Sequence, residues 1–240
     1  MPRLLPALVA EAIGVFALSF VGILAIHQLG GPNVGPTGLI GIALAHGLIL
    51  AIMISAFGAT SGGHMNPAVT VGLLVGGKIK PGPAAAYIVA QCIGGFLAGV
   101  AMMAIFSSQD AARFIAEGTP QIGITDLKQP AVTAIGGCFA ELVTTFFLVA
   151  AVWGTAVDPR APKIGGFGIG LTVAADILAI GPLTGAAMNP ARAFGPALAA
   201  SLAGAKFDWS SHWIYWVGPI AGGILASLVY KGLIYPKEPK

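Results

Sequence analysis

Charged residues are scarce in this chain of 240 residues, because Asp, Glu, Lys and Arg together make up 9% of the sequence. A soluble domain carries about a quarter charged residues. The low charge, the 56% of hydrophobic residues and the mean hydropathy of +0.87 exclude an ordinary soluble domain. The net charge of +3 is small and dispersed, so it predicts no nucleic-acid partner. We therefore expect an integral membrane protein whose surroundings are lipid.

The residue sets on which enzymes and metal sites depend are also missing. The sequence shows no nucleophile paired with a base, no phosphate-binding loop and no cluster of metal ligands, so we expect no enzyme, metal or cofactor. Its two cysteines, Cys92 and Cys138, lie in apolar runs, where a thiol is typically a small buried hydrophobic group. No linker rich in serine, proline or charge divides the chain, which predicts one domain over residues 1–240.

Six apolar runs are long enough to cross a bilayer, which takes about 20 helical residues. They cover residues 4–29, 38–59, 83–106, 131–157, 164–181 and 212–234. Two further segments begin at Asn66 and Asn189, extend for about ten residues and reach across half a bilayer at most. The first run carries Glu11 and is long enough to span, so we expect a retained helix rather than a cleaved signal.

Lysine and arginine are unevenly divided between the two sides of this arrangement. One side holds eight, namely Arg3, Lys78, Lys80, Arg160, Lys163, Lys231, Lys237 and Lys240, and the other holds three, namely Arg113, Lys128 and Lys206. Basic residues near span ends favour the cytoplasmic side. We therefore expect both termini in the cytoplasm. We also favour a plasma or inner membrane over an organelle membrane.

The chain repeats itself at an offset of about 130 residues. EAIGVF at 11–16 recurs as ELVTTF at 141–146, and AAYIVAQCIGGFLAG at 85–99 recurs as WIYWVGPIAGGILAS at 213–227. Each half holds three spans, an odd number, so the second half enters the membrane from the opposite side. The sequence predicts an inverted repeat, with a first copy over about residues 1–115 and a second over about 130–240.

Each short segment starts with the same tripeptide. The two motifs are Asn66-Pro67-Ala68 and Asn189-Pro190-Ala191. Proline suits the first position of a helix and asparagine suits its cap, so each motif predicts the start of a short helix. Irregular backbone at membrane depth must be buried in protein or wetted, so we expect both segments to dip inward and meet. Two interfacial helices are the alternative, disfavoured because the motif recurs at the same place in the repeat.

This arrangement has an electrostatic consequence at the bilayer centre. Each helix N-terminus carries about half a positive charge, so two facing N-termini repel cations, while the two asparagine amides donate hydrogen bonds to water. Arg192 follows one helical turn after Asn189 and faces the same side, where the first copy has Val69. An arginine in a membrane usually lines a wet cavity. We therefore predict a pore guard, with a structural salt bridge as the alternative.

These features resemble the aquaporin, or major intrinsic protein, family along nearly the whole chain. The resemblance rests on both tripeptides and on Glu11, Gln91, Glu141 and Arg192. It implies an all-α membrane fold of six transmembrane helices and two re-entrant half-helices, assembled as a homotetramer with one pore in each protomer. It also implies that the two glutamates accept hydrogen bonds from N–H groups of the two dips, which are the glycine-rich segments that lead into Asn66 and Asn189.

The resemblance further implies that Arg192 shares a constriction, the selectivity filter of the pore, with His46, Ile177 and Ala186. This set is similar to the plant tonoplast intrinsic proteins and leaves a wider opening than the aromatic residue and histidine of water-strict members. It implies a passive channel for water, ammonia, urea, hydrogen peroxide and glycerol that excludes protons and ions. Relatives with this filter often add a histidine after the third span, but residues 107–130 contain none, and Asp126 falls near that place.

Two more polar residues in apolar surroundings each have two interpretations. His64 either packs in the first dip or lines its vestibule. Asp176 lies inside a span, where a carboxylate is costly, and points about 100° away from its neighbour Ile177. We expect a structural role for Asp176, protonated or bonded to backbone or a neighbouring helix. The alternative is that it orients the filter residues.

Three other functions compete with the water channel. A glycerol facilitator is disfavoured because such channels resemble NPARD, whereas Ala193 follows Arg192 here, and because Tyr215-Trp216 is typical of water channels. An alternating-access transporter also uses inverted repeats and half-helices, but it needs a coupling-ion site, for which Asp176 and the two glutamates are the candidates. A junction-forming scaffold with little flux is the third.

Overall fold

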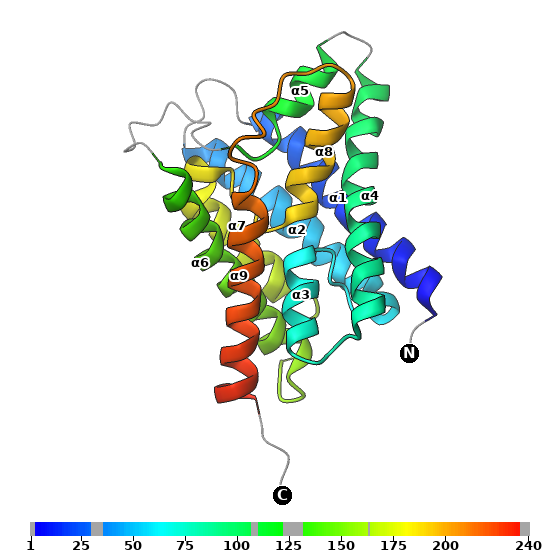
Figure 1. Cartoon of the computed structure of the whole chain (residues 1–240), viewed down its shortest axis with the longest axis vertical. Coiled ribbons are helices and arrows are strands. Elements are labelled where there is room, and N and C mark those ends of the chain that lie inside the picture. Colours follow the sequence, from blue (N-terminus) through cyan, green and yellow to red (C-terminus); the bar gives the residue numbers. More distant parts are fainter. Residues whose placement is uncertain (1–2, 30–35, 107–109, 122–131, 163, 236–240) are drawn as a thin grey trace, which may run out of the picture.

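The computed structural model describes residues 3–29, 36–106, 110–121, 132–162 and 164–235, and Asp126 lies outside them. Helices are the only regular structure in these residues (Figure 1). Six segments are long and apolar enough to cross a membrane: α1 (Leu4–Leu29), α2 (Pro36–Ser61), α4 (Pro81–Ile105), α6 (Ala134–Val152) continued by η1 (Trp153–Val157), α7 (Phe167–Thr184), and α9 (Ile214–Val229) continued by η2 (Tyr230–Ile234). The predicted fold class is confirmed.

The two short segments are helices that start at the predicted prolines, α3 (Pro67–Val75) and α8 (Pro190–Leu202). At 13 residues, α8 is longer than expected. A further helix, α5 (Ala111–Glu117), follows α4 and was not predicted. Its seven residues span about two turns, too few to show a recognisable apolar period.

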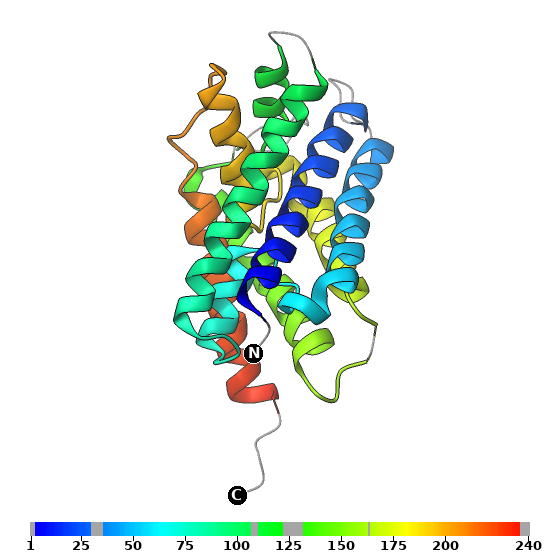
Figure 2. The same ribbon diagram turned by 90° about the vertical axis from the view of Figure 1, so that its right-hand side faces the viewer.

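The packing of the helices is nearly symmetric between the two halves. α1 packs against α2 and α4, and α6 packs in the same way against α7 and α9. Figure 2 shows α1 beside both of its neighbours. Each half-helix packs against a long helix of the other half of the chain: α3 lies against α9, and α8 lies against α4. The two halves also meet where α2 packs against α7. The start of α1 and the end of η2 lie at the same end of the bundle (Figure 1).

Two glycines of the long helices allow the half-helices to come close. A Cβ at Gly95 would lie 2.5 Å from the carbonyl oxygen of Ala191, and a Cβ at Gly223 would lie 2.6 Å from that of Ala68. Side chains do not fit at such distances, and small residues are the usual solution for close helix packing in lipid. These contacts fix the first turns of α8 and α3 inside the bundle.

Candidate functional site

Asparagine caps begin both half-helices. The Oδ1 of Asn66 accepts a hydrogen bond from the N–H of Ala68 at 2.8 Å. The Oδ1 of Asn189 accepts from the N–H groups of Ala191 at 3.1 Å and Arg192 at 3.2 Å. Both asparagines are extended and a proline follows each, so the predicted capping is confirmed.

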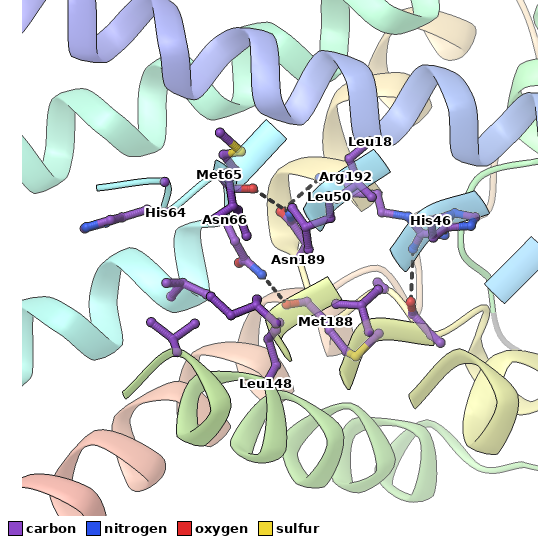
Figure 3. A pocket seen from close by; sticks show the side chains of 18 of the residues that line it. Leu18, His46, Leu50, His64, Met65, Asn66, Leu148, Met188, Asn189 and Arg192 are labelled. Atoms are coloured by element: carbon purple, nitrogen blue, oxygen red, sulfur yellow. Dashed lines mark hydrogen bonds between the residues drawn. The ribbon is translucent and has the colours of Figure 1, made fainter. Parts of the chain in front are cut away.

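The same asparagines join the two halves of the chain. The Nδ2 of Asn66 donates to the carbonyl oxygen of Met188 at 2.8 Å, and the Nδ2 of Asn189 donates to that of Met65 at 2.9 Å (Figure 3). Met65 and Met188 have φ values of 47° and 50°, a left-handed conformation that costs about 1–3 kcal/mol for a non-glycine residue. The reciprocal bonds hold the two helix N-termini together, as the inverted repeat predicts.

Glu11 organises the first dip from α1. Its carboxylate accepts hydrogen bonds from the Oγ of Ser61 at 2.6 Å, the N–H of His64 at 2.9 Å, the N–H of Met65, and the Nε2 of Gln91 at 2.7 Å. The side chain of Glu11 is fully buried. A buried carboxylate is tolerated when such donors surround it, so this residue supports the backbone of the dip, as the resemblance implied.

Glu141, which lies on α6, accepts hydrogen bonds from the second dip as Glu11 does from the first. It accepts from the Oγ1 of Thr184 at 2.7 Å and from the N–H groups of Ala187 at 2.9 Å and Met188 at 2.6 Å. Glu141 is also fully buried. The two glutamates therefore serve the two dips in equivalent ways.

Four hydroxyl residues hold these dips in ways that the sequence reasoning did not assign: Ser61 and Thr184 at the ends of α2 and α7, Tyr87 on α4 and Tyr215 on α9. Tyr87 donates to the carbonyl oxygen of Ser61 at 2.8 Å, and Tyr215 donates to that of Thr184 at 2.7 Å. The repeat offsets were a signal for them, because Ser61 and Thr184 are as far apart in sequence as the two asparagines, and the tyrosines fall at the same place in the recurring segments 85–99 and 213–227.

His64 both packs in the first dip and contributes to a cavity. Its ring lies edge-on to Tyr87, with centroids 5.2 Å apart, and its Nδ1 is 3.2 Å from the Oγ1 of Thr70. The hydroxyl of Thr70 donates to the carbonyl oxygen of Asn66 at 2.9 Å and accepts from the Nε2 of Gln91 at 3.0 Å. Because the hydroxyl proton is already used, the Nδ1 of His64 is the donor to Thr70.

One cavity connects the polar groups of both halves. Its wall includes both asparagines, His64, and all four residues predicted for the constriction, His46, Ile177, Ala186 and Arg192. In Figure 3, His64 and His46 lie at opposite ends with the two asparagines between them. Aliphatic side chains complete the wall, among them Leu50, Val69 and Leu148. Glu11, Gln91, Glu141 and Asp176 do not line this cavity.

Arg192 and His46 are bonded to each other at one end of the cavity. The Nη2 of Arg192 donates to the Nε2 of His46 at 2.8 Å, and its Nη1 donates to the carbonyl oxygen of Ala186 at 3.1 Å. A guanidinium has no acceptor, so His46 carries its proton on Nδ1, which lies 2.8 Å from the carbonyl oxygen of Ile42. Among the described residues no carboxylate lies within 4.0 Å of this guanidinium, which excludes the salt bridge there.

Asp176 stands apart from the filter. It is buried on α7, and its Oδ2 has no hydrogen-bond partner among the described residues. No filter residue bonds to this oxygen, which argues against the orienting role. A buried polar atom without a partner is costly, and the structural role of Asp176 stays a prediction.

Comparisons with known proteins place the chain in a family. The sequence model of the major intrinsic protein family matches residues 2–230. Aquaporin TIP4-4 of Zea mays is 43% identical, over 95% of this chain and 86% of that protein, and probable aquaporin TIP3-2 of Arabidopsis thaliana is 42% identical, over 98% and 86%.

The fold has a close match among solved structures. The aquaglyceroporin from Plasmodium falciparum, solved by X-ray methods, matches with a TM-score of 0.82 at 22% identity, over 97% of both chains. At this identity the likeness shows the fold alone. Together with the family match, it leads to one conclusion: the chain belongs to the major intrinsic protein family, the family of the aquaporins, whose members are channels and not enzymes.

Proposed function

We propose that this protein is a passive channel for water that also admits ammonia, urea, hydrogen peroxide and glycerol and excludes protons and ions. One observation carries the proposal: Asn66 and Asn189 bond across to Met188 and Met65, which holds two helix N-termini against one cavity. Membership of the aquaporin family supports the same class of function.

Charge exclusion follows from the groups around the cavity. Each helix N-terminus contributes about half a positive charge, and Arg192 adds a full one at the filter end. Each asparagine amide uses one N–H in its cross-bond, and the second N–H remains for a water molecule. A water that accepts from both amides directs its own hydrogens outward along the file, which interrupts a proton wire.

The range of solutes rests on the walls of the filter. Ile177 and Ala186 are aliphatic, and one is small, so we infer an opening wider and less polar than an aromatic ring would leave. Arg192 offers donors to the carbonyl group of urea. Ala193 separates this sequence from the glycerol-facilitator pattern, and Tyr215-Trp216 is typical of water channels, so water is the primary solute in this proposal. Ala193 is fully buried and does not line the cavity.

An alternating-access transporter is less well supported. Its coupling-ion site would need a carboxylate that solute or ion can reach. Glu11 and Glu141 are committed to the dips, and Asp176 does not line the cavity. These placements favour a channel.

Assembly and orientation belong to the same proposal. The chain is a multi-pass membrane protein by its six apolar helices, and we infer cytoplasmic termini from the eight-to-three excess of basic residues on one side. A homotetramer follows from the family resemblance. The TIP relatives are tonoplast intrinsic proteins, which argues against the expected plasma or inner membrane.

Stopped-flow light scattering of proteoliposomes tests the proposal. Vesicles with the protein should shrink faster than bare vesicles under osmotic load, and they should take up urea, ammonia and glycerol only to equilibrium. Shrinkage no faster than that of bare vesicles would support the scaffold. Accumulation of solute against its gradient would support the transporter.

A further inference from the structure

Gly22 of α1 lies directly behind the filter histidine. The three atoms nearest to a Cβ at this position all belong to the His46 ring: its Nε2, its Cδ2 at 2.7 Å and its Cε1 at 2.9 Å. Gly22 is buried and does not line the cavity, whereas His46 does. The imidazole therefore stands between this point of α1 and the cavity.

The imidazole has little freedom to move away. Its Nδ1 is bonded to the carbonyl oxygen of Ile42 and its Nε2 to Arg192, each at 2.8 Å, and the side chain is 1% exposed. A shift of the ring large enough to admit a methyl group would stretch one bond or both. A flexible, solvent-exposed side chain at the same distance would simply turn aside.

We propose that Gly22 is a positioning residue of the filter: its missing side chain provides the space in which His46 accepts the hydrogen bond from Arg192. The inference rests on the proposed channel function. It extends the filter to α1, since His46 comes from α2, Ile177 from α7, and Ala186 and Arg192 from the second dip and α8.

A methyl group at position 22 has a directional effect. Because the ring stands between α1 and the cavity, the methyl group pushes it toward the cavity and narrows the opening. It also separates the Nε2 of His46 from the Nη2 of Arg192. A narrower opening slows urea more than water, since urea is the larger molecule.

The experiment compares two glycine-to-alanine variants in proteoliposomes. Gly22→Ala should lower the ratio of urea to water permeability by about threefold or more. An extra methyl group in a packed site displaces its neighbours, and a threefold change needs only a small rise in the barrier for urea relative to that for water. Gly58→Ala is the matched control, since Gly58 lies on α2 and a Cβ there meets no atom within 4 Å. This control should leave the ratio unchanged.

A double variant separates the collision from a general packing defect. In a His46→Ala background the ring is gone, so Gly22→Ala should no longer change the ratio. If Gly22→Ala alone fails to fold and the double variant folds, the collision with the ring is again supported. Failure of both to fold, an unchanged ratio in Gly22→Ala, or the same shift in both backgrounds would overturn the inference. Loss of the proposed function is distinguishable, because the unmodified protein would then conduct no water.

Discussion

Arg192 and His46 act as a unit, because each supplies the other's hydrogen-bond partner inside a buried site. The guanidinium donates to the imidazole and to the carbonyl oxygen of Ala186, and the imidazole is held in turn by Ile42. Further N–H groups of Arg192 remain for a solute. Changes at either residue should therefore alter selectivity before they alter the fold.

Replacement of Arg192 by valine tests charge exclusion. Arg192→Val removes the full positive charge at the filter end. It introduces the residue type that Val69 provides at the equivalent place of the first half. We expect proton leak to rise by about tenfold, the equivalent of about 1.4 kcal/mol in the barrier. A pH-sensitive dye inside proteoliposomes measures the leak. Arg113→Val, at a side chain 76% exposed, is the control, and an unchanged leak in Arg192→Val would contradict its role as a guard.

Replacement of His46 by phenylalanine tests the assigned filter. The ring of His46→Phe accepts no hydrogen bond from Arg192 and is bulkier, so the opening should become narrower and more hydrophobic. We expect ammonia and urea flux to fall more than water flux. Stopped-flow measurements on one vesicle preparation give all three rates, and equal losses would reject the assignment.

At the scale of elements, each dip depends on one buried carboxylate from a long helix. Glu11 and Glu141 satisfy backbone N–H groups that no regular hydrogen bonding reaches. The left-handed residues Met65 and Met188 follow directly, with their carbonyl oxygens bonded to the opposite asparagine. The dips, the caps and the half-helices are therefore one cooperative unit.

Replacement of Glu141 by glutamine should destabilise this unit. In Glu141→Gln, an NH₂ group takes the place of one acceptor oxygen and faces backbone donors. Hydrogen bonds to charged groups contribute about 1.5–3 kcal/mol each, so we expect a loss of about 2 kcal/mol in unfolding free energy. Thermal unfolding in detergent measures the effect against Glu117→Gln, an exposed control. Similar stability of the two variants would argue against a supporting role.

At the scale of the whole molecule, the end of the last span is tied to the loop that follows η1. Arg160 bonds to both carboxylate oxygens of Asp158, at 3.0 and 2.6 Å, and to the carbonyl oxygen of Ile234 at 3.0 Å. The hydroxyl of Tyr230 donates to Asp158 at 3.2 Å. Hydrogen bonds from Arg160 hold the pKa of the Asp158 carboxyl well below its usual range.

This tie should make stability depend on pH. Because the pKa of Asp158 is lower in the folded protein, its contribution to stability is present above the ordinary value of about 4 and is lost as the pH falls through the folded pKa. Between about pH 6 and pH 3, the advantage in Tm of the unmodified protein over Asp158→Asn should shrink. An advantage that stays constant over this range would count against the tie.

The sequence alone determined the six spans, the two half-helices and the asparagine caps of this protein, and the family resemblance pointed to the partners of Arg192. The length of each apolar run sets whether a segment spans the membrane or reaches only half-way, and this length is a local property of the sequence. An asparagine followed by proline favours the start of a helix whatever its tertiary surroundings, so the starts of α3 and α8 followed from the tripeptides. Recurrence of Glu11 as Glu141 then pointed to an inverted pair.

Only the tertiary structure decided which groups meet. Asn66 bonds to a carbonyl oxygen 122 residues away, and Arg192 reaches an imidazole 146 residues away. The second contact fixed the tautomer of His46, and the packing of α1 placed Gly22 behind the ring. Local sequence carries no record of them, because a hydrogen bond between distant segments depends on how helices pack, and the packing is the sum of many small contacts rather than the property of any one stretch.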